Sequence, residues 1–156
     1  MKLPHLYSVE REFNVPLSKL WRAWTDAQSL EIWHHPVGMN CVLGATESEM
    51  VVGGLWSYAV QAPGRESISY FFGKYLEITE NVKFIHSMHY TESKEDFEIK
   101  DFTTPAHEIG VEFQSRSEKS WCKFSQFGQA PVEQVALMTQ GIESYFDSLE
   151  NFLTKE

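Results

Sequence analysis

The chain has 156 residues, of which 42% are hydrophobic and 14% aromatic, and its 22 acidic residues against 13 basic ones give a net charge of −9. This length suits one domain with a substantial core, and we expect a single domain over residues 1–156. The acidic balance argues against binding to nucleic acid or to an anionic membrane, because both would repel such a surface.

The sequence shows no targeting or membrane-spanning segment. Its first ten residues, MKLPHLYSVE, lack the apolar stretch of a secretory signal, and no apolar run approaches the roughly 20 residues that span a bilayer. We therefore expect a cytoplasmic protein without membrane contact. Cys41 and Cys122 are far apart in the sequence, and we expect both to be reduced, buried thiols.

One strand and two short helices are predicted before residue 34. Residues His5 to Phe13 carry largely apolar residues at every second position, which is typical of a half-buried strand. A helix is expected to begin with Pro16 at its first position, because apolar residues then follow at three- and four-residue spacing. Asp26 is placed to cap a second short helix over Gln28 to Trp33.

From Met39 onward the pattern changes to a period of two, which predicts strands joined by short links. Links of this length favour antiparallel hairpins. The charged stretch from Glu92 to Pro105 has no clean period and is predicted to be a mobile hairpin loop. The expected strands cover Asn40 to Thr46, Leu55 to Gln61, Ser67 to Ile78, Val82 to Thr91, Glu108 to Arg116 and Ser120 to Phe127.

The longest periodic segment runs from Pro131 to Leu153 and has its apolar residues on one helical face. At about 1.5 Å per residue it predicts a helix roughly 33 Å long. Because one long helix accompanies many strands, the sheet must bury itself against that helix. We therefore expect an α+β helix-grip fold: a curved antiparallel sheet of about seven strands wraps the C-terminal helix, and two short helices follow the first strand.

Signatures of catalysis and of metal binding are missing from the sequence. There is no G-x-S-x-G element, and Val52-Gly53-Gly54 lacks the Lys-Ser/Thr continuation of a phosphate-binding loop. His86 and His89 lie three apart in an expected strand, so they point to opposite faces and cannot share one ion. His34 and His35 are expected in a turn-rich loop, facing solvent or lying at a pocket mouth. We expect no metal, no cofactor and no catalytic residue.

The rings on the expected strands are more informative. Strand positions that share a face carry rings, Met and a few polar tips, which is typical of an apolar ligand pocket; a solid aromatic core is the open alternative. Gly141 fits either a close approach of the C-terminal helix to the sheet or room for a ligand. The candidate ligand-binding residues are Trp33, Trp56, Tyr70, Phe72, His86, Met88, Phe124 and Tyr145.

Several blocks occur in a recognisable order along nearly the whole chain. They are Val15-Pro16, Leu20 to Asp26, Leu30 to Trp33, Val52 to Gly54, Phe72 to Ile78, Asn81 to Ile85, and Gly141 with Tyr145 to Leu149 and Leu153. The set resembles the SRPBCC (START-like) superfamily, and more narrowly the family named after the C-terminal domain of the activator of the ninety-kilodalton heat-shock protein ATPase. Two positions depart from that family's pattern: Val51 stands where Arg is common, and Ile142 where Trp is common.

The resemblance implies the helix-grip fold with an internal hydrophobic cavity, and it does not supply one activity. Our leading hypothesis is a non-enzymatic domain that binds a small apolar or aromatic molecule between the sheet and the C-terminal helix. A module that regulates a chaperone ATPase, with the chaperone as partner, is the alternative. An enzyme like the polyketide aromatase/cyclases, in which His86 or a pocket carboxylate acts as acid or base, is the minor alternative.

Overall fold

The computed structural model describes residues 2–155. The helices are α1 (Leu17–Thr25), α2 (Ala27–Trp33), α3 (Lys94–Ile99) and α4 (Val132–Thr154). The strands are β1 (His5–Phe13), β2 (Asn40–Cys41), β3 (Glu47–Ser48), β4 (Leu55–Gln61), β5 (Ser69–Thr79), β6 (Lys83–Thr91), β7 (His107–Arg116) and β8 (Lys119–Phe127).

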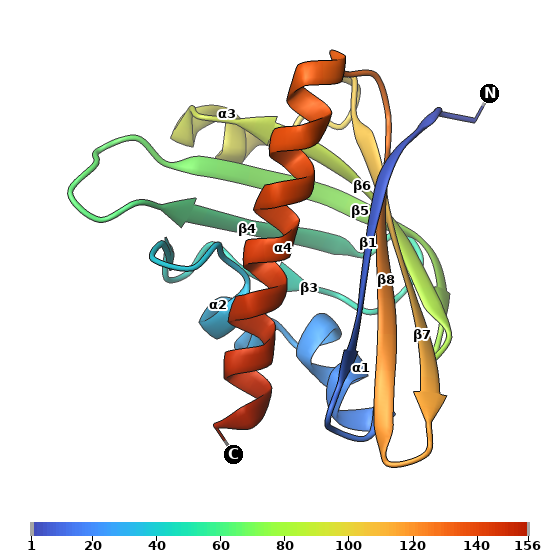
Figure 1. The fold of residues 1–156 in the computed structure, drawn as a ribbon. Helices are drawn as coiled ribbons and strands as arrows, with labels where there is room; N and C mark the ends of the chain where they lie inside the picture. The colour runs from blue at the N-terminus through green and yellow to red at the C-terminus, as the bar shows by residue number, and fades with distance from the viewer. Residues whose placement is uncertain (1, 156) are drawn as a thin grey trace.

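All strands join one curved sheet, and α4 crosses its concave face (Figure 1). The strand order is β1-β8-β7-β6-β5-β4-β2, and β3 pairs with β4 beside β2. Every strand pair is antiparallel. The two short helices α1 and α2 lie at one end of this concave face, against α4. The α+β helix-grip architecture predicted from the sequence is confirmed.

Two stretches differ from the predictions. Of the single strand expected over Asn40 to Thr46, only β2 forms, because the chain turns at Gly44, whose φ of +87° is easily adopted only by glycine; the short strand β3 follows after Thr46. The stretch expected to be a mobile loop contains α3. The hydroxyl of Ser93 caps this helix by accepting from the backbone N–H of Asp96 at 3.2 Å.

The turn between α1 and α2 follows the prediction made for Asp26. Its carboxylate accepts from the backbone N–H of Ser29 at 3.1 Å, as an N-cap does. Trp33, at the end of α2, donates its indole N–H to the carbonyl of Ala23 at 2.8 Å and packs edge-on against Trp24, with ring centres 4.8 Å apart. These contacts fix the two helices to each other.

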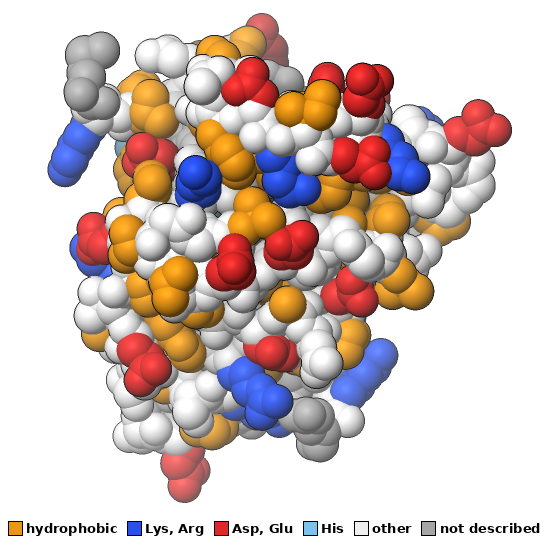
Figure 2. All heavy atoms as spheres, turned by 180° about the vertical axis from the view of Figure 1, so that it is seen from behind, with side chains coloured by type: hydrophobic (Ala, Val, Ile, Leu, Met, Phe, Trp, Pro, Cys, Tyr) orange, Lys and Arg blue, Asp and Glu red, His pale blue; other side chains and the backbone are white. Residues whose placement is uncertain are grey.

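The sheet buries apolar side chains on both faces. The inner core lies under α1, α2 and α4. A smaller outer cluster forms where Phe97 of α3 packs against Tyr70 and Phe72 of β5. On the outer side of the sheet, charged side chains of both signs are interspersed with hydrophobic side chains (Figure 2).

The two halves of α4 differ in burial. Phe146 and Leu149 in the second half are fully buried, whereas Val132 and Leu137 in the first half are 84% and 66% exposed. The second half is also held by charge. Arg11 of β1 donates to carboxylates of α4, at 2.8 Å to Asp147, 3.0 Å to Glu143 and 3.4 Å to Glu150. The helix is therefore anchored to the sheet mainly by its C-terminal half.

Two further predictions concern thiols and membranes. Both cysteines are free, as expected, but only Cys122 is fully buried; Cys41 is half-buried. Within residues 2–155, no helix is long and apolar enough to cross a membrane.

Candidate functional site

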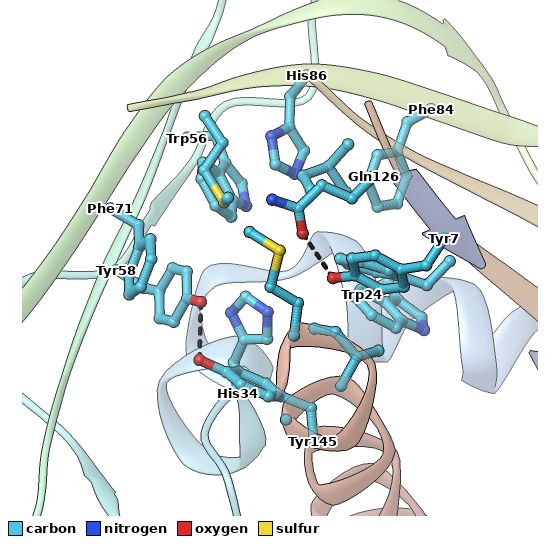
Figure 3. A pocket seen from close by; sticks show the side chains of 16 residues that line it. Tyr7, Trp24, His34, Trp56, Tyr58, Phe71, Phe84, His86, Gln126 and Tyr145 are labelled. Carbon is cyan, nitrogen blue, oxygen red and sulfur yellow. Dashed lines mark hydrogen bonds between the residues drawn. The ribbon is translucent and has the colours of Figure 1, made fainter. Parts of the chain in front are cut away.

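A pocket of about 230 Å³ lies between the inner face of the sheet and α4 (Figure 3). Its walls come from six strands, from α1, from the residue after α2, and from the middle of α4. Most of the 16 lining residues carry rings, and none of them is an Asp, Glu, Lys or Arg. An engineered cavity of about 150 Å³ holds one benzene ring, so this space suits a molecule of one or two rings.

Most of the lining residues proposed from the sequence face this pocket. They come from β4, β6, β8 and α4, and alternation along each strand brings them to the same side. They are Trp56, His86, Met88, Phe124 and Tyr145.

The placement of Tyr70 and Phe72 in the pocket is wrong. Both lie on the outer face, where Tyr70 stacks on Phe97 with ring centres 4.7 Å apart. Phe71, between them in β5, points into the pocket instead. The period of two is correct. However, β5 is apolar on both sides, because α3 covers its outer side. The pattern alone therefore does not say which side faces inward.

Trp33 is also outside the pocket. It is fully buried, and its hydrogen bond to Ala23 makes it a brace between α1 and α2. The prediction failed because a buried Trp at the end of a helix looks the same in sequence whether it contacts a ligand or a neighbouring helix.

The residue that sequence reasoning most clearly missed is His34. It follows α2 in what was expected to be a solvent-facing loop or a pocket mouth, yet its side chain is buried in the pocket wall. Its ring packs on Tyr58 with centres 4.0 Å apart. A loop position has no period, so no pattern could have found it. Tyr58, by contrast, lies two residues from Trp56 and could have been found by alternation.

Four polar side chains of the pocket form two hydrogen-bonded pairs (Figure 3). The hydroxyl of Tyr7 donates to the side-chain carbonyl of Gln126 at 2.5 Å. The hydroxyls of Tyr58 and Tyr145 are 2.9 Å apart and share one hydrogen bond. Burial raises the pKa of Tyr58 and of Tyr145 well above the usual value for tyrosine, so both hydroxyls are protonated at neutral pH.

His86 is held in a defined orientation above Trp56. Its Nδ1 lies 2.8 Å from the backbone carbonyl of Ser87, and its ring stacks on Trp56 with centres 3.7 Å apart. Gly73 of β5 lies opposite Trp56 of β4. A Cβ atom added to Gly73 would come within 1.8 Å of the Ser87 carbonyl oxygen. A side chain at position 73 would therefore displace the carbonyl that orients His86.

Both pocket histidines are neutral at neutral pH. Burial, together with the neighbouring His86 and His35, lowers the pKa of His34 to about 3. Burial lowers the pKa of His86 to about 4, against the opposing effect of the hydrogen bond to Ser87. Because no charged residue lines the pocket, its interior carries no net charge near pH 7.

The other histidine of β6 lies away from the pocket, as its spacing predicted. His89 is on the outer face, where it stacks on Phe72 and its Nδ1 lies 2.8 Å from the hydroxyl of Thr104. Among residues 2–155, no group of three or more His, Cys, Asp or Glu side chains is arranged to hold a metal ion.

Residues 14–154 match the family described as Activator of Hsp90 ATPase homolog 1-like protein. The chain belongs to this family. Membership confirms the resemblance drawn from the ordered blocks, and it makes this Hsp90-activator-like chain a ligand-binding or regulatory domain in general terms. No curated protein matches the sequence.

Solved structures of bacterial proteins share the fold of this Hsp90-activator-like chain. A protein from Staphylococcus epidermidis is 23% identical, with a TM-score of 0.77 and coverage of 99% of this chain and 92% of its own. A protein from Chromobacterium violaceum is 19% identical, with a TM-score of 0.76 and coverage of 96% and 97%. The AHSA1 protein from Silicibacter pomeroyi is 14% identical, with a TM-score of 0.78 and coverage of 94% and 96%. At these identities the likeness shows the fold alone.

Proposed function

We propose that this domain binds a small, uncharged aromatic molecule between the sheet and α4, without catalysing a reaction. The observation that carries the proposal is the pocket of about 230 Å³, lined mostly by rings and free of charged side chains. Burial of apolar surface contributes about 25 cal/mol per Å² before the costs of association, so a small aromatic molecule gains affinity mainly by filling this space.

The mouth of the pocket supports the same function. A larger groove of about 860 Å³ runs beside the first half of α4, and it shares Phe71, Met88, Gln126 and Met138 with the pocket. Methionine side chains are flexible and adapt to different shapes. Met88 and Met138 therefore separate the outer groove from the inner pocket with side chains that can change conformation and let a ligand pass.

The test is a titration with naphthalene, followed by backbone amide shifts in NMR spectra. We expect shifts at residues around the pocket, including His86 and Tyr145. Ile142→Trp places an indole into the pocket wall and is expected to abolish those shifts. Leu137→Trp adds the same ring on the exposed side of α4 and is expected to leave them unchanged. Wild-type protein without shifts, or an Ile142→Trp variant that binds equally well, would contradict the proposal.

Regulation of a chaperone ATPase is the second candidate, and the family description favours it. The Ile142→Trp variant separates the two functions, because a regulatory surface on the exterior does not need an empty pocket. If the domain is a regulator, wild-type and variant protein will change the ATPase rate of a purified ninety-kilodalton chaperone equally.

A further inference from the structure

Most polar groups of the pocket already have protein partners. The amide nitrogen of Gln126 donates to Nδ1 of His107 at 2.8 Å, and Nε2 of His107 lies 3.2 Å from the carbonyl of Gln129. Because a carbonyl only accepts, the chain of hydrogen bonds has one direction, from Tyr7 through Gln126 to His107 and out to the surface. These groups, and the bonded pair Tyr58 and Tyr145, are therefore committed within the protein.

His86 is different, because its tautomer is fixed while one nitrogen stays unused. The carbonyl of Ser87 can only accept, so Nδ1 of His86 carries the hydrogen. A neutral imidazole has one N–H, which leaves Nε2 as a hydrogen-bond acceptor. Within residues 2–155, no side chain or backbone group hydrogen-bonds this nitrogen, and the His86 ring lines the pocket.

The orientation of this acceptor is built into the sheet. Trp56 stacks against one side of the ring, and Gly73 allows the Ser87 carbonyl to lie close to β5. The ring cannot turn over without losing the bond to Ser87. His86 therefore presents an unused acceptor in a fixed place on the pocket wall.

His34 does not set a direction in the same way. Its Nδ1 is buried without a hydrogen-bond partner among the described residues, and no protein group fixes which nitrogen carries the hydrogen. A neutral His34 can therefore donate to or accept from a ligand group. An unpartnered, buried imidazole is a second sign that the pocket is built to receive a molecule with some polar character.

We propose that the preferred ligand is an uncharged phenol of one or two rings, whose hydroxyl donates to Nε2 of His86. This inference rests on the proposed function and adds the chemical class of the ligand. The size of the pocket sets the number of rings, and the lone pair of Nε2 sets the direction of the hydrogen bond. An anionic ligand is disfavoured, because it would face that lone pair in a pocket without a cationic side chain.

The test compares four compounds with the same bicyclic ring by calorimetry at pH 7: naphthalene, 2-naphthol, 2-methoxynaphthalene and 2-naphthoate. A ligand whose polar group cannot donate to Nε2 of His86 forfeits that hydrogen bond, which corresponds to about a tenfold loss of affinity. We expect 2-naphthol to bind about tenfold more tightly than naphthalene. We also expect it to exceed 2-methoxynaphthalene, which has no hydrogen to donate, and we expect 2-naphthoate to bind most weakly.

Two variants locate the effect. His86→Phe keeps a ring on Trp56 but removes the acceptor, so the preference for 2-naphthol over naphthalene is expected to fall to about onefold. His89→Phe, on the outer face of the same strand, is the matched control and is expected to keep the full preference. The four-compound series in wild-type protein gives an answer even if a variant does not fold.

The possible failures are distinct. If none of the four compounds binds, the proposed function itself is wrong. If naphthalene binds as tightly as 2-naphthol, the pocket is a ligand site without the polarity inferred here. If the preference for 2-naphthol survives in His86→Phe, the hydroxyl binds elsewhere and the assignment of His86 is overturned.

Discussion

Gly141 lines the pocket from the middle of α4, and a Cβ atom added to it would meet no atom within 4 Å apart from its chain neighbours and the adjacent helix backbone. The first explanation offered by its sequence, a close approach of the helix to the sheet, is therefore wrong. Glycine inside a helix costs about 1 kcal/mol relative to alanine. The chain thus keeps a helix-weakening residue at a position where no packing contact requires it and where the pocket is open.

The helical cost of Gly141 can be measured directly. We expect Gly141→Ala to raise the free energy of unfolding by about 1 kcal/mol, because the added methyl group causes no clash and removes backbone freedom from the unfolded chain. Ala136→Gly, at an exposed position of the same helix, is the reverse control and is expected to lower it by a similar amount. Urea denaturation checks both, and a destabilised Gly141→Ala would show that the helix does pack closely there.

For single residues, the period of two along the strands predicted which residues share a face of the sheet, but it did not always predict which face points inward. It separated His86 from His89, and it also brings Trp56 and Tyr58 to one face. It failed where a strand is apolar on both sides. His34 was beyond its reach, because a residue in an irregular segment is positioned by tertiary packing, which sequence periodicity does not describe.

Among the elements, α4 is joined to β1 partly through Arg11. Three carboxylates, on Glu143, Asp147 and Glu150, surround this one guanidinium, and without it they would repel one another along the helix. The acidic partners are each about half exposed, so each ion pair is weakened by solvent. The guanidinium also lies 5.6 Å from the ring centre of Phe146.

We expect Arg11→Met, which keeps an apolar stem, to lower the free energy of unfolding by about 1 kcal/mol at low salt. The loss is expected to shrink in about 1 M NaCl, where charges are screened within about 3 Å. Arg116→Met removes a longer ion pair, 3.5 Å from Glu12, and is expected to cost less. Urea titrations at two salt concentrations measure these differences. An Arg11→Met effect that does not depend on salt would assign the role of Arg11 to packing instead of charge.

The long elements were predictable and the short ones were not. The helix α4 and the strands after β3 are long enough for their apolar period to repeat several times. In contrast, α3 has six residues with a single buried ring, Phe97, so its period could not be seen in a charged stretch. The strands β2 and β3 have two residues each and exist only because β4 lies beside them.

For the whole molecule, the two neutral pocket histidines make the free energy of unfolding depend on pH. In the unfolded chain a histidine takes up a proton near pH 6.5, whereas in the folded state burial holds the pKa of His34 at about 3 and that of His86 at about 4. Between these values the unfolded state binds more protons. The contribution of the two neutral histidines to the free energy of unfolding is therefore fully present above pH 6.5, and it is lost as the pH falls from 6.5 toward their folded-state pKa values.

The expected slope is about 1.4 kcal/mol per pH unit for each histidine below pH 6.5. Replacing His34 or His86 with Phe is expected to reduce the slope of unfolding free energy between pH 6 and pH 5, since each variant removes one proton site. His5→Gln, at the exposed start of β1, is the control for the loss of a histidine outside the pocket. Denaturation at a series of pH values measures it, and equal slopes in all variants would mean that the pocket histidines are protonated in the folded state.

The overall architecture was the part of this molecule most accessible from sequence, because it follows from a long amphipathic helix and a run of short, linked strands. The pocket was less accessible. Its position depends on whether side chains from distant segments, such as Tyr7 and Met138, fill the space between the sheet and α4. That outcome is decided by three-dimensional packing, so the same pattern of rings was compatible with a solid core.

The unequal halves of α4 bear on how proteins with this fold can diverge. The C-terminal half carries the buried apolar residues and the partners of Arg11, whereas Met138, Gly141 and Ile142, where the helix emerges from the core, line the pocket beside Tyr145. Substitutions at those three positions change the space offered to a ligand with little effect on the anchoring contacts. Under the proposed function, exchanging a few side chains of one helical turn would therefore change the ligand preference while the same scaffold is kept.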